Sequence, residues 1–228
     1  MELKPWYPRD FKLALSNTFS EDDLSLLLQQ PGSSPRFVYG VLMLPSVLKY
    51  YIDAEPGSQI HQSMTPATLF GYQLHRFSEC STPVIARSSN PQAAVEGMLI
   101  FSLDEKQRNA IYELEGGLMC LANVQVEICQ KDAAQVHTLR IVDAGAFTWT
   151  DPRVALVPIR STSWSFDHFL KGPFYQYMTD SQRRSSSKLL RSSETNHPST
   201  GARRSAGPVA QDHESHLYCL KEDSGSVF

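Results

Sequence analysis

The chain has no long hydrophobic run. Its longest apolar stretch, residues 37–44, is far too short to span a bilayer. The N-terminal sequence MELKPWYPRD carries acidic residues and prolines and lacks the apolar core of a signal peptide. We therefore expect a cytoplasmic protein that makes no use of a membrane.

Strong charge of either sign is also missing. The formal net charge is -3, so no strongly basic field is available to hold a nucleic acid. Charged residues make up 20% and hydrophobic residues 41% of the sequence, which is the balance of a globular protein. We therefore expect no nucleic-acid partner, and the oligomeric state stays open.

Common metal and cofactor motifs are absent as well. The four cysteines, at positions 80, 120, 129 and 219, form no CxxC pair and have no histidine at zinc-finger spacing. Cys120 and Cys129 lie in or beside an apolar run, so we expect buried, reduced thiols there. No glycine-rich phosphate loop and no GxSxG motif occurs. We expect neither a metal nor a cofactor.

Helix signals occur at four places. Residues 9–30 follow a helical pattern in which Ser20 precedes three acidic residues, as at a helix N-terminus. Pro45 opens a short second helix. The stretch Ser102–Glu105 predicts a capping box at the start of a third. Apolar spacing predicts a last helix over residues 164–170.

Strand-like segments separate these helices and outnumber them. The pattern predicts strands at residues 37–39, 67–77, 95–103, 119–129, 136–144 and 146–150, with Gly97 as a bulge or a point of close backbone approach. Strands with interspersed short helices, and only one good βαβ-length unit, favour a mixed α+β domain around a curved sheet.

The composition changes near residue 180. From there the chain is rich in Ser, Arg and Pro and poor in large apolar residues, so it cannot bury enough surface to offset its chain entropy. We therefore expect three parts: a helical N-terminal extension over residues 1–34, one domain over residues 35–179, and a disordered tail over residues 180–228.

The segment Tyr39-Gly40-Val41-Leu42 is a candidate binding loop. A strand that ends in Gly and runs into a helix exposes backbone N–H groups, which can receive a carboxylate or another anion. The same pattern also fits an ordinary strand-to-helix turn, which needs Gly for its dihedral angles.

Glu115 is the candidate catalytic residue. It precedes Gly116-Gly117, which ends a helix whose apolar face includes Ile111 and Leu114. A carboxylate on that face at a helix C-terminus is disfavoured by desolvation and by the helix dipole, so its pKa should rise. The alternative is a solvated glutamate in the last turn.

The order of these segments resembles the gamma-glutamylcyclotransferase-like, or avirulence-induced-gene-like, family. The resemblance covers roughly residues 36–178 and rests on an ordered set of short motifs. These are Tyr39-Gly40-Val41-Leu42, Leu69-Phe70-Gly71-Tyr72, Pro83-Val84-Ile85, Val95-Glu96-Gly97-Met98-Leu99, Glu115-Gly116, Val124-Gln125-Val126 and the helix that begins at Trp164.

The resemblance implies a small, partly closed β-barrel with flanking helices. It also implies a cofactor-independent cyclotransferase, an enzyme that releases 5-oxoproline and a free amine or amino acid from a small γ-glutamyl compound. Glu115 would then be the general acid/base. The loop Tyr39, Gly40, Val41 and Leu42 would bind the substrate through its backbone N–H groups.

Several positions depart from the family pattern. Apolar or aromatic residues stand where polar groups are usual, namely Val41, Tyr112, Met119, Leu121 and Phe147. Two alternatives therefore remain beside the cyclotransferase. One is a non-catalytic member that binds a more apolar ligand or a partner. The other is a lyase or cyclase of a biosynthetic pathway that reuses Glu115.

Overall fold

The computed structural model describes residues 3–55, 57–77, 83–116, 119–131, 136–151, 156–159 and 166–194. Within these ranges, helices and strands alternate along the chain, with two short 3₁₀ turns at Gly40–Met43 and Ile60–Ser63. In chain order the elements are α1 Arg9–Ser16, α2 Glu21–Gln29, β1 Arg36–Val38, α3 Pro45–Tyr51, β2 Met64–Phe70, β3 Tyr72–Phe77, β4 Pro83–Arg87, β5 Ala94–Ile100, α4 Glu105–Glu115, β6 Cys120–Lys131, β7 His137–Thr148, β8 Leu156–Pro158, α5 Phe166–Lys171 and α6 Pro173–Glu194.

Five strands close into a barrel in the order β1-β5-β2-β6-β7. Every neighbouring pair is antiparallel except β1 and β7, which pair in parallel at Arg36 with Gly145 and at Phe37 with Ala146. A smaller sheet of order β4-β3-β8 lies beside the barrel. The predicted α+β barrel is confirmed, and the barrel is fully closed.

The barrel interior is filled by side chains that alternate along the strands, as the pleat of a strand requires. They include Phe37, Leu69, Leu99, Val126 and Ala146, all buried. Gly97 gives β1 room, because a Cβ there would lie 2.4 Å from Phe37 Cζ and 2.5 Å from the Val38 carbonyl oxygen. The predicted close approach at Gly97 is confirmed.

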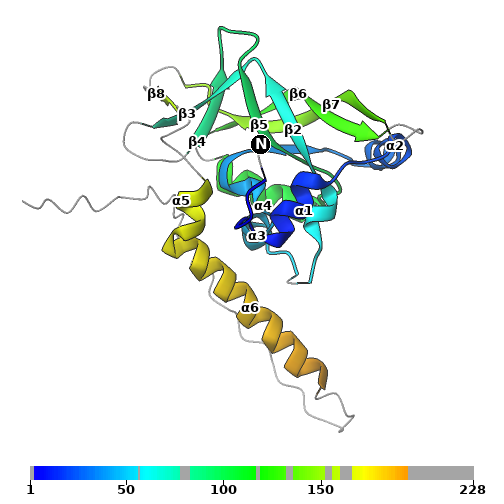
Figure 1. The fold of residues 1–228 in the computed structure, drawn as a ribbon, viewed down its shortest axis with the longest axis vertical. Helices are drawn as coiled ribbons and strands as arrows, with labels where there is room; N and C mark the ends of the chain where they lie inside the picture. Colours follow the sequence, from blue (N-terminus) through cyan, green and yellow to red (C-terminus); the bar gives the residue numbers. More distant parts are fainter. Residues whose placement is uncertain are drawn as a thin grey trace, which may run out of the picture.

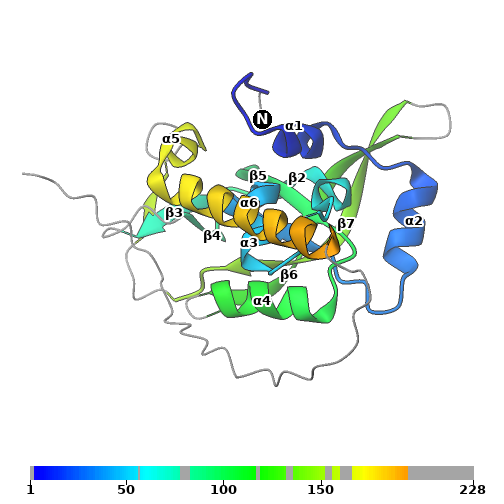
Figure 2. The ribbon, with the colours of Figure 1, turned by 90° about the horizontal axis from the view of Figure 1, so that it is seen from below.

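A second apolar core lies between the barrel and the helices. Helices α1, α3, α4 and α6 gather on one side of the barrel, with α6 lying across α3 in the view from below (Figures 1 and 2). Each of the four contributes a buried side chain, namely Phe11, Leu48, Ile111 and Met178. This packing fixes the C-terminal end of α4 against the barrel wall.

Side chains cap the N-termini of α2 and α4, and the capping residues of α4 differ from those that the sequence predicts. Ser20 caps α2 by accepting the Asp23 backbone N–H, as predicted. The capping box of α4 consists of Asp104 and Gln107, so the prediction of Ser102–Glu105 is wrong by two residues. Ser102 instead has a positive φ of 56°.

Two strand boundaries also differ from the sequence pattern. The single strand expected over residues 67–77 is two strands, β2 and β3, because Gly71 turns the chain with a φ of 75°. The two strands expected over residues 136–144 and 146–150 are one continuous strand, β7, since its pairing with β6 runs on through Gly145.

Helix α6 runs through residue 180 and ends at Glu194, where the sequence pattern predicts an unstructured segment. The buried Met178 and the hydrogen bond from Gln182 Nε2 to the Ser46 carbonyl oxygen (2.8 Å) hold it to α3. Residues 195–228 lie outside the described ranges. The division into residues 1–34, 35–179 and 180–228 stays a prediction.

The cysteines differ from expectation in one case. Cys120 is exposed, so the prediction of a buried thiol is wrong there, while Cys129 is partly buried. The other two cysteines lie outside the described residues. Among the helices that the structure describes, none is long and apolar enough to cross a membrane.

Candidate functional site

The loop Tyr39–Leu42 forms because β1 ends abruptly at Val38. Tyr39 is still extended, with φ -139° and ψ 177°, and Gly40 then starts the 3₁₀ turn with a φ of 60°. A Cβ at Gly40 would lie 2.8 Å from Pro83 Cγ. Glycine is therefore required here both by the backbone conformation and by the close contact with β4.

The side chain of Tyr39 points into the space between β1, β4 and β7. Its hydroxyl donates to the Phe147 carbonyl oxygen (3.0 Å) and lies 3.2 Å from Met119 Sδ. Burial raises the pKa of Tyr39 well above 10, and the nearby Glu115 carboxylate raises it further, against a hydrogen bond with the Ile85 backbone that lowers it. The phenol therefore stays neutral under ordinary conditions.

Glu115 is the last residue of α4. Its carbonyl oxygen accepts the Met119 N–H (3.1 Å) as the chain turns back toward β6. Burial raises the pKa of its carboxyl group from 4.5 to about 7. The predicted direction is confirmed, and desolvation is its cause. Glu113, on the same helix, is exposed.

Tyr39 and Glu115 are far apart in sequence yet close enough in space for one charge to shift the pKa of the other group. They meet because β1 pairs with β7, while the loop after α4 leads into β6, the other neighbour of β7. The arrangement supplies a carboxyl group that is half-ionised near neutral pH beside a neutral phenol. Such a carboxyl can both accept and return a proton.

Four of the five departures from the family pattern, all except Val41, divide into a buried pair and an exposed pair. Met119 is buried with its Sδ against the Tyr39 hydroxyl, whereas buried Phe147 meets that hydroxyl through its main-chain carbonyl oxygen. Tyr112 is largely exposed, with its ring 5.8 Å from that of Phe147. Leu121 is exposed and lies over Gly145, on the outer wall of the barrel. Of these four residues, only Met119 places its side chain against the Tyr39 hydroxyl.

Strand β4 contributes two contacts that sequence reasoning missed. Pro83 packs against Gly40, and the backbone of Ile85 bonds to Tyr39. The only signal for them was a proline followed by two apolar residues, which predicts a strand but not its partner. The contacts depend on how β4 lies across the end of the barrel.

A cavity of about 670 Å³ lies elsewhere, between residues 33–35, the β2–β3 turn and the middle of β6 and β7. It is lined by none of Tyr39, Gly40, Val41, Leu42 or Glu115. Among the described residues, no three His, Cys, Asp or Glu side chains are grouped as metal ligands. The candidate site is therefore not this cavity but the region where Glu115, whose pKa is raised, lies near the loop Tyr39–Leu42.

Comparison with known proteins identifies similar chains. The profile of a family described as gamma-glutamyl cyclotransferase, AIG2-like, matches residues 36–166. A solution structure from Arabidopsis thaliana is 20% identical and covers 78% of this chain and 98% of its own, with a TM-score of 0.42. A protein called gamma-glutamyl cyclotransferase is 14% identical and covers 78% and 94%, with a TM-score of 0.39. An uncharacterised protein from Pyrococcus horikoshii is 17% identical and covers 72% and 99%, with a TM-score of 0.36. No curated protein matches the chain significantly.

Proposed function

The chain belongs to the gamma-glutamyl cyclotransferase, AIG2-like family, and we propose that it converts a γ-glutamyl compound into 5-oxoproline and a free amine or amino acid. Family membership supports the reaction class. The observation that carries the proposal is Glu115, a partly buried carboxyl whose pKa is raised to about 7 beside the Tyr39 loop. A group that changes charge near neutral pH is suited to taking up and returning protons in one catalytic cycle.

In the proposed reaction, the Glu115 carboxylate removes a proton from the substrate's α-ammonium group. The freed amine nitrogen attacks the γ-carbonyl carbon, a new C–N bond closes the five-membered ring, and the carbonyl electron pair moves to oxygen. Glu115 then gives its proton to the leaving nitrogen, the C=O bond re-forms, and the old C–N bond breaks. A second proton passes from the ring nitrogen through Glu115 to the released amine, which leaves as its ammonium ion.

The loop Tyr39–Leu42 is proposed to bind the substrate's carboxylate and the oxygen that gains negative charge. Backbone N–H groups at the start of the turn can donate to both without a charged side chain. Gly40 keeps the loop close to Pro83, so the donors stay fixed before substrate arrives. Fixed donors avoid the cost of reorganisation when charge develops on the oxygen.

A second candidate is a member that binds a more apolar ligand without turning it over. The observation favouring it is Met119, whose thioether sulfur, with no hydrogen-bond donor, lies against the Tyr39 hydroxyl. Fewer polar contacts would weaken the binding of a zwitterionic substrate, since each charge-assisted hydrogen bond contributes about 1.5–3 kcal/mol. The same residue would suit a γ-glutamyl compound with an apolar amine.

Incubation of the purified chain with a panel of γ-glutamyl amines, amides and peptides tests the proposal, with 5-oxoproline measured by mass spectrometry. We expect turnover of at least one compound and a loss of about 10²–10⁴-fold in Glu115→Gln, because glutamine cannot accept and return a proton. Glu113→Gln, an equivalent change at an exposed position, should keep full activity. Binding of a panel compound with no 5-oxoproline from the unmodified chain would favour the second candidate.

The pH dependence gives an independent check on the role of Glu115. The carboxylate must be ionised to accept the first proton, so kcat/KM should rise as pH increases through about 7, the pKa of Glu115. A rate that is flat between about pH 5 and pH 8 would show that another group accepts the proton.

A further inference from the structure

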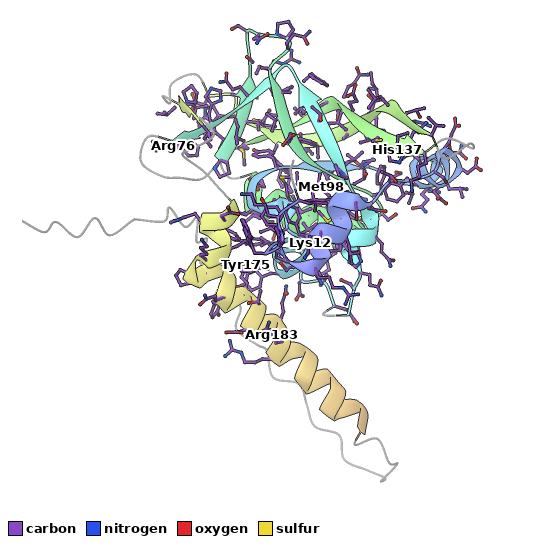
Figure 3. The ribbon with its side chains drawn as sticks, viewed as in Figure 1. Lys12, Arg76, Met98, His137, Tyr175 and Arg183 are labelled. Carbon is purple, nitrogen blue, oxygen red and sulfur yellow. The ribbon has the colours of Figure 1, made fainter. Side chains whose placement is uncertain are left out.

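Strand β7 is only partly covered along its outer edge. It pairs with β6 along its whole length, from His137 opposite Lys131 to Thr148 opposite Cys120. On the other side, β1 pairs with it only at Gly145 and Ala146. Residues 137–143 therefore have a strand neighbour on one side only within the described part of the chain. This stretch belongs to the hairpin that projects from the barrel beside α2, with His137 near its end (Figures 2 and 3).

The backbone of this open stretch has a defined polarity. Gly145 donates its N–H across the outer edge to the Pro35 carbonyl oxygen (2.9 Å). Successive residues of a strand turn their N–H and C=O groups to opposite sides, and the pairing with β6 runs without a break. The residues at odd positions, His137, Leu139, Ile141 and Asp143, therefore turn their backbone donors and acceptors toward the open edge.

The side chains of these residues are unusual for a strand edge. Leu139 is 70% exposed and Ile141 is 64% exposed, on the same face of the hairpin. Exposed edge strands usually carry charged side chains, proline or a bulge, each of which prevents pairing with another chain. On this face only His137 and Asp143 are ionisable, and the two large aliphatic side chains between them accompany a continuous row of backbone donors and acceptors, an arrangement that can accept a further strand.

We propose that this edge pairs with the same edge of a second copy of this chain, giving an antiparallel two-fold dimer through β7. The register places Leu139 opposite the partner's Ile141 and His137 opposite the partner's Asp143. A two-fold axis then passes beside Arg140, the middle residue of the open stretch. Both subunits present the same patch, as a two-fold symmetric interface requires.

Hydrogen bonding and side-chain chemistry select this register. This register places all four residues whose backbone groups face the open edge in hydrogen-bonded pairs with the partner strand. A shift of two residues in one direction places Leu139 opposite the partner's Asp143, and in the other direction places His137 opposite the partner's Ile141. Each shift loses one pair within residues 137–143 and sets a charged or polar side chain against an aliphatic one. The chosen register instead joins aliphatic to aliphatic and imidazole to the Asp143 carboxylate, which also accepts the Gln125 side-chain amide on its Oδ1 (3.2 Å).

Arg140 limits the strength of the dimer. The two copies of this guanidinium lie beside the axis, where like charges directly opposite each other repel. A seven-residue strand edge also buries less area than the roughly 1,200–2,000 Å² of stable complexes, so dissociation in the micromolar range is expected.

Sedimentation velocity of the full chain tests the dimer between about 1 µM and 200 µM, the range in which a weak dimer forms and dissociates. We expect a monomer–dimer equilibrium that Ile141→Lys weakens by about tenfold or more, because lysine on an edge strand opposes pairing. Val157→Lys makes the same kind of change on an exposed aliphatic residue of β8, on the other side of the molecule from the hairpin (Figure 1), and it should dimerise as the unmodified chain does. A chain that stays monomeric throughout, or an Ile141→Lys variant that dimerises normally, would overturn the proposal.

Disulfide trapping tests the register. Residues opposite each other in a non-hydrogen-bonded antiparallel pair have Cα atoms about 4.5 Å apart, within reach of a disulfide. Arg140→Cys should therefore give a covalent dimer on mild oxidation, above the level that the native cysteines give in the unmodified chain. A covalent dimer from Leu139→Cys, with none from Arg140→Cys, would show a different contact and refute the pairing given above.

Discussion

Replacing Glu115 by glutamine should stabilise the protein, and more so as pH rises. The folded-state pKa of about 7 lies above the unfolded value of 4.5, so the folded state binds more protons between these two values. Stability of the unmodified chain therefore falls as pH increases from about 4.5 to about 7, and then levels off. Glutamine is isosteric and neutral at every pH, so it removes this loss.

The expected gain follows from the two pKa values of Glu115. At pH 5 most folded molecules still carry the proton on Glu115. The unmodified chain then loses about 1 kcal/mol of its free energy of unfolding. At pH 8 the full separation applies, and the loss is about 3 kcal/mol. The stability difference between Glu115→Gln and the unmodified chain should therefore grow by about 2 kcal/mol between pH 5 and pH 8.

Urea unfolding at several pH values between about 5 and 8 measures this gain directly. Glu113→Gln is the matched control, because Glu113 is exposed on the same helix and its replacement should not alter the slope with pH. A difference between the Glu115→Gln and unmodified proteins that is constant across the range would refute the reasoning. It would mean that the Glu115 carboxylate is solvated when the chain is folded.

Four further substitutions, one of them a control, test by chemical unfolding how the scaffold is held together. Gly40→Ala should lower the free energy of unfolding by about 3 kcal/mol, because it adds a clash with Pro83 to the strain of a positive φ. Gly71→Ala is the control, because Gly71 has the same kind of φ but open space around it, and it should lower the free energy of unfolding by about 1 kcal/mol. Equal losses would mean that the Pro83 contact is unimportant. Asp104→Ala should cost about 1 kcal/mol through loss of the α4 cap, and an unchanged midpoint would argue against the capping box. Met178→Ala should cost about 2–4 kcal/mol if α6 docks as described, and a negligible loss would show that it does not.

Local signals gave reliable information where short-range chemistry decides the structure. Ser20 starts α2 and Pro45 starts α3, because a side-chain cap and a fixed φ act within one turn. Gly97 marked a close backbone approach, since only glycine leaves space for Phe37. These features depend on a few neighbouring residues, and a sequence contains them directly.

Features that depend on long-range pairing were harder to predict. The break at Gly71 and the continuity of β7 through Gly145 are decided by which strands pair, and glycine occurs in both places. Helix α6 extends into a Ser- and Arg-rich segment because Met178 and Gln182 attach it to the domain. Average composition does not reveal two well-placed contacts of this kind.

The candidate site shows the same division. The raised pKa of Glu115 could be predicted, because burial at a helix end has a known direction of effect. Its position beside Tyr39 could be expected only from the resemblance to a family. The interaction of Tyr39 with Met119 and Phe147 needed the folded chain, because three separate elements meet there.

The parallel contact between β1 and β7 has a consequence for how the protein is made. Arg36 leaves the ribosome long before Gly145, its partner in the barrel wall. At about 5–20 residues per second, the first strand waits on the order of 5–20 s before the wall can close. During that interval the apolar inner face of β1, including Phe37, has no complete barrel to enter. Chaperone binding to nascent chains should therefore be strongest just before β7 emerges, and slowing translation at that point should lower the yield of folded protein.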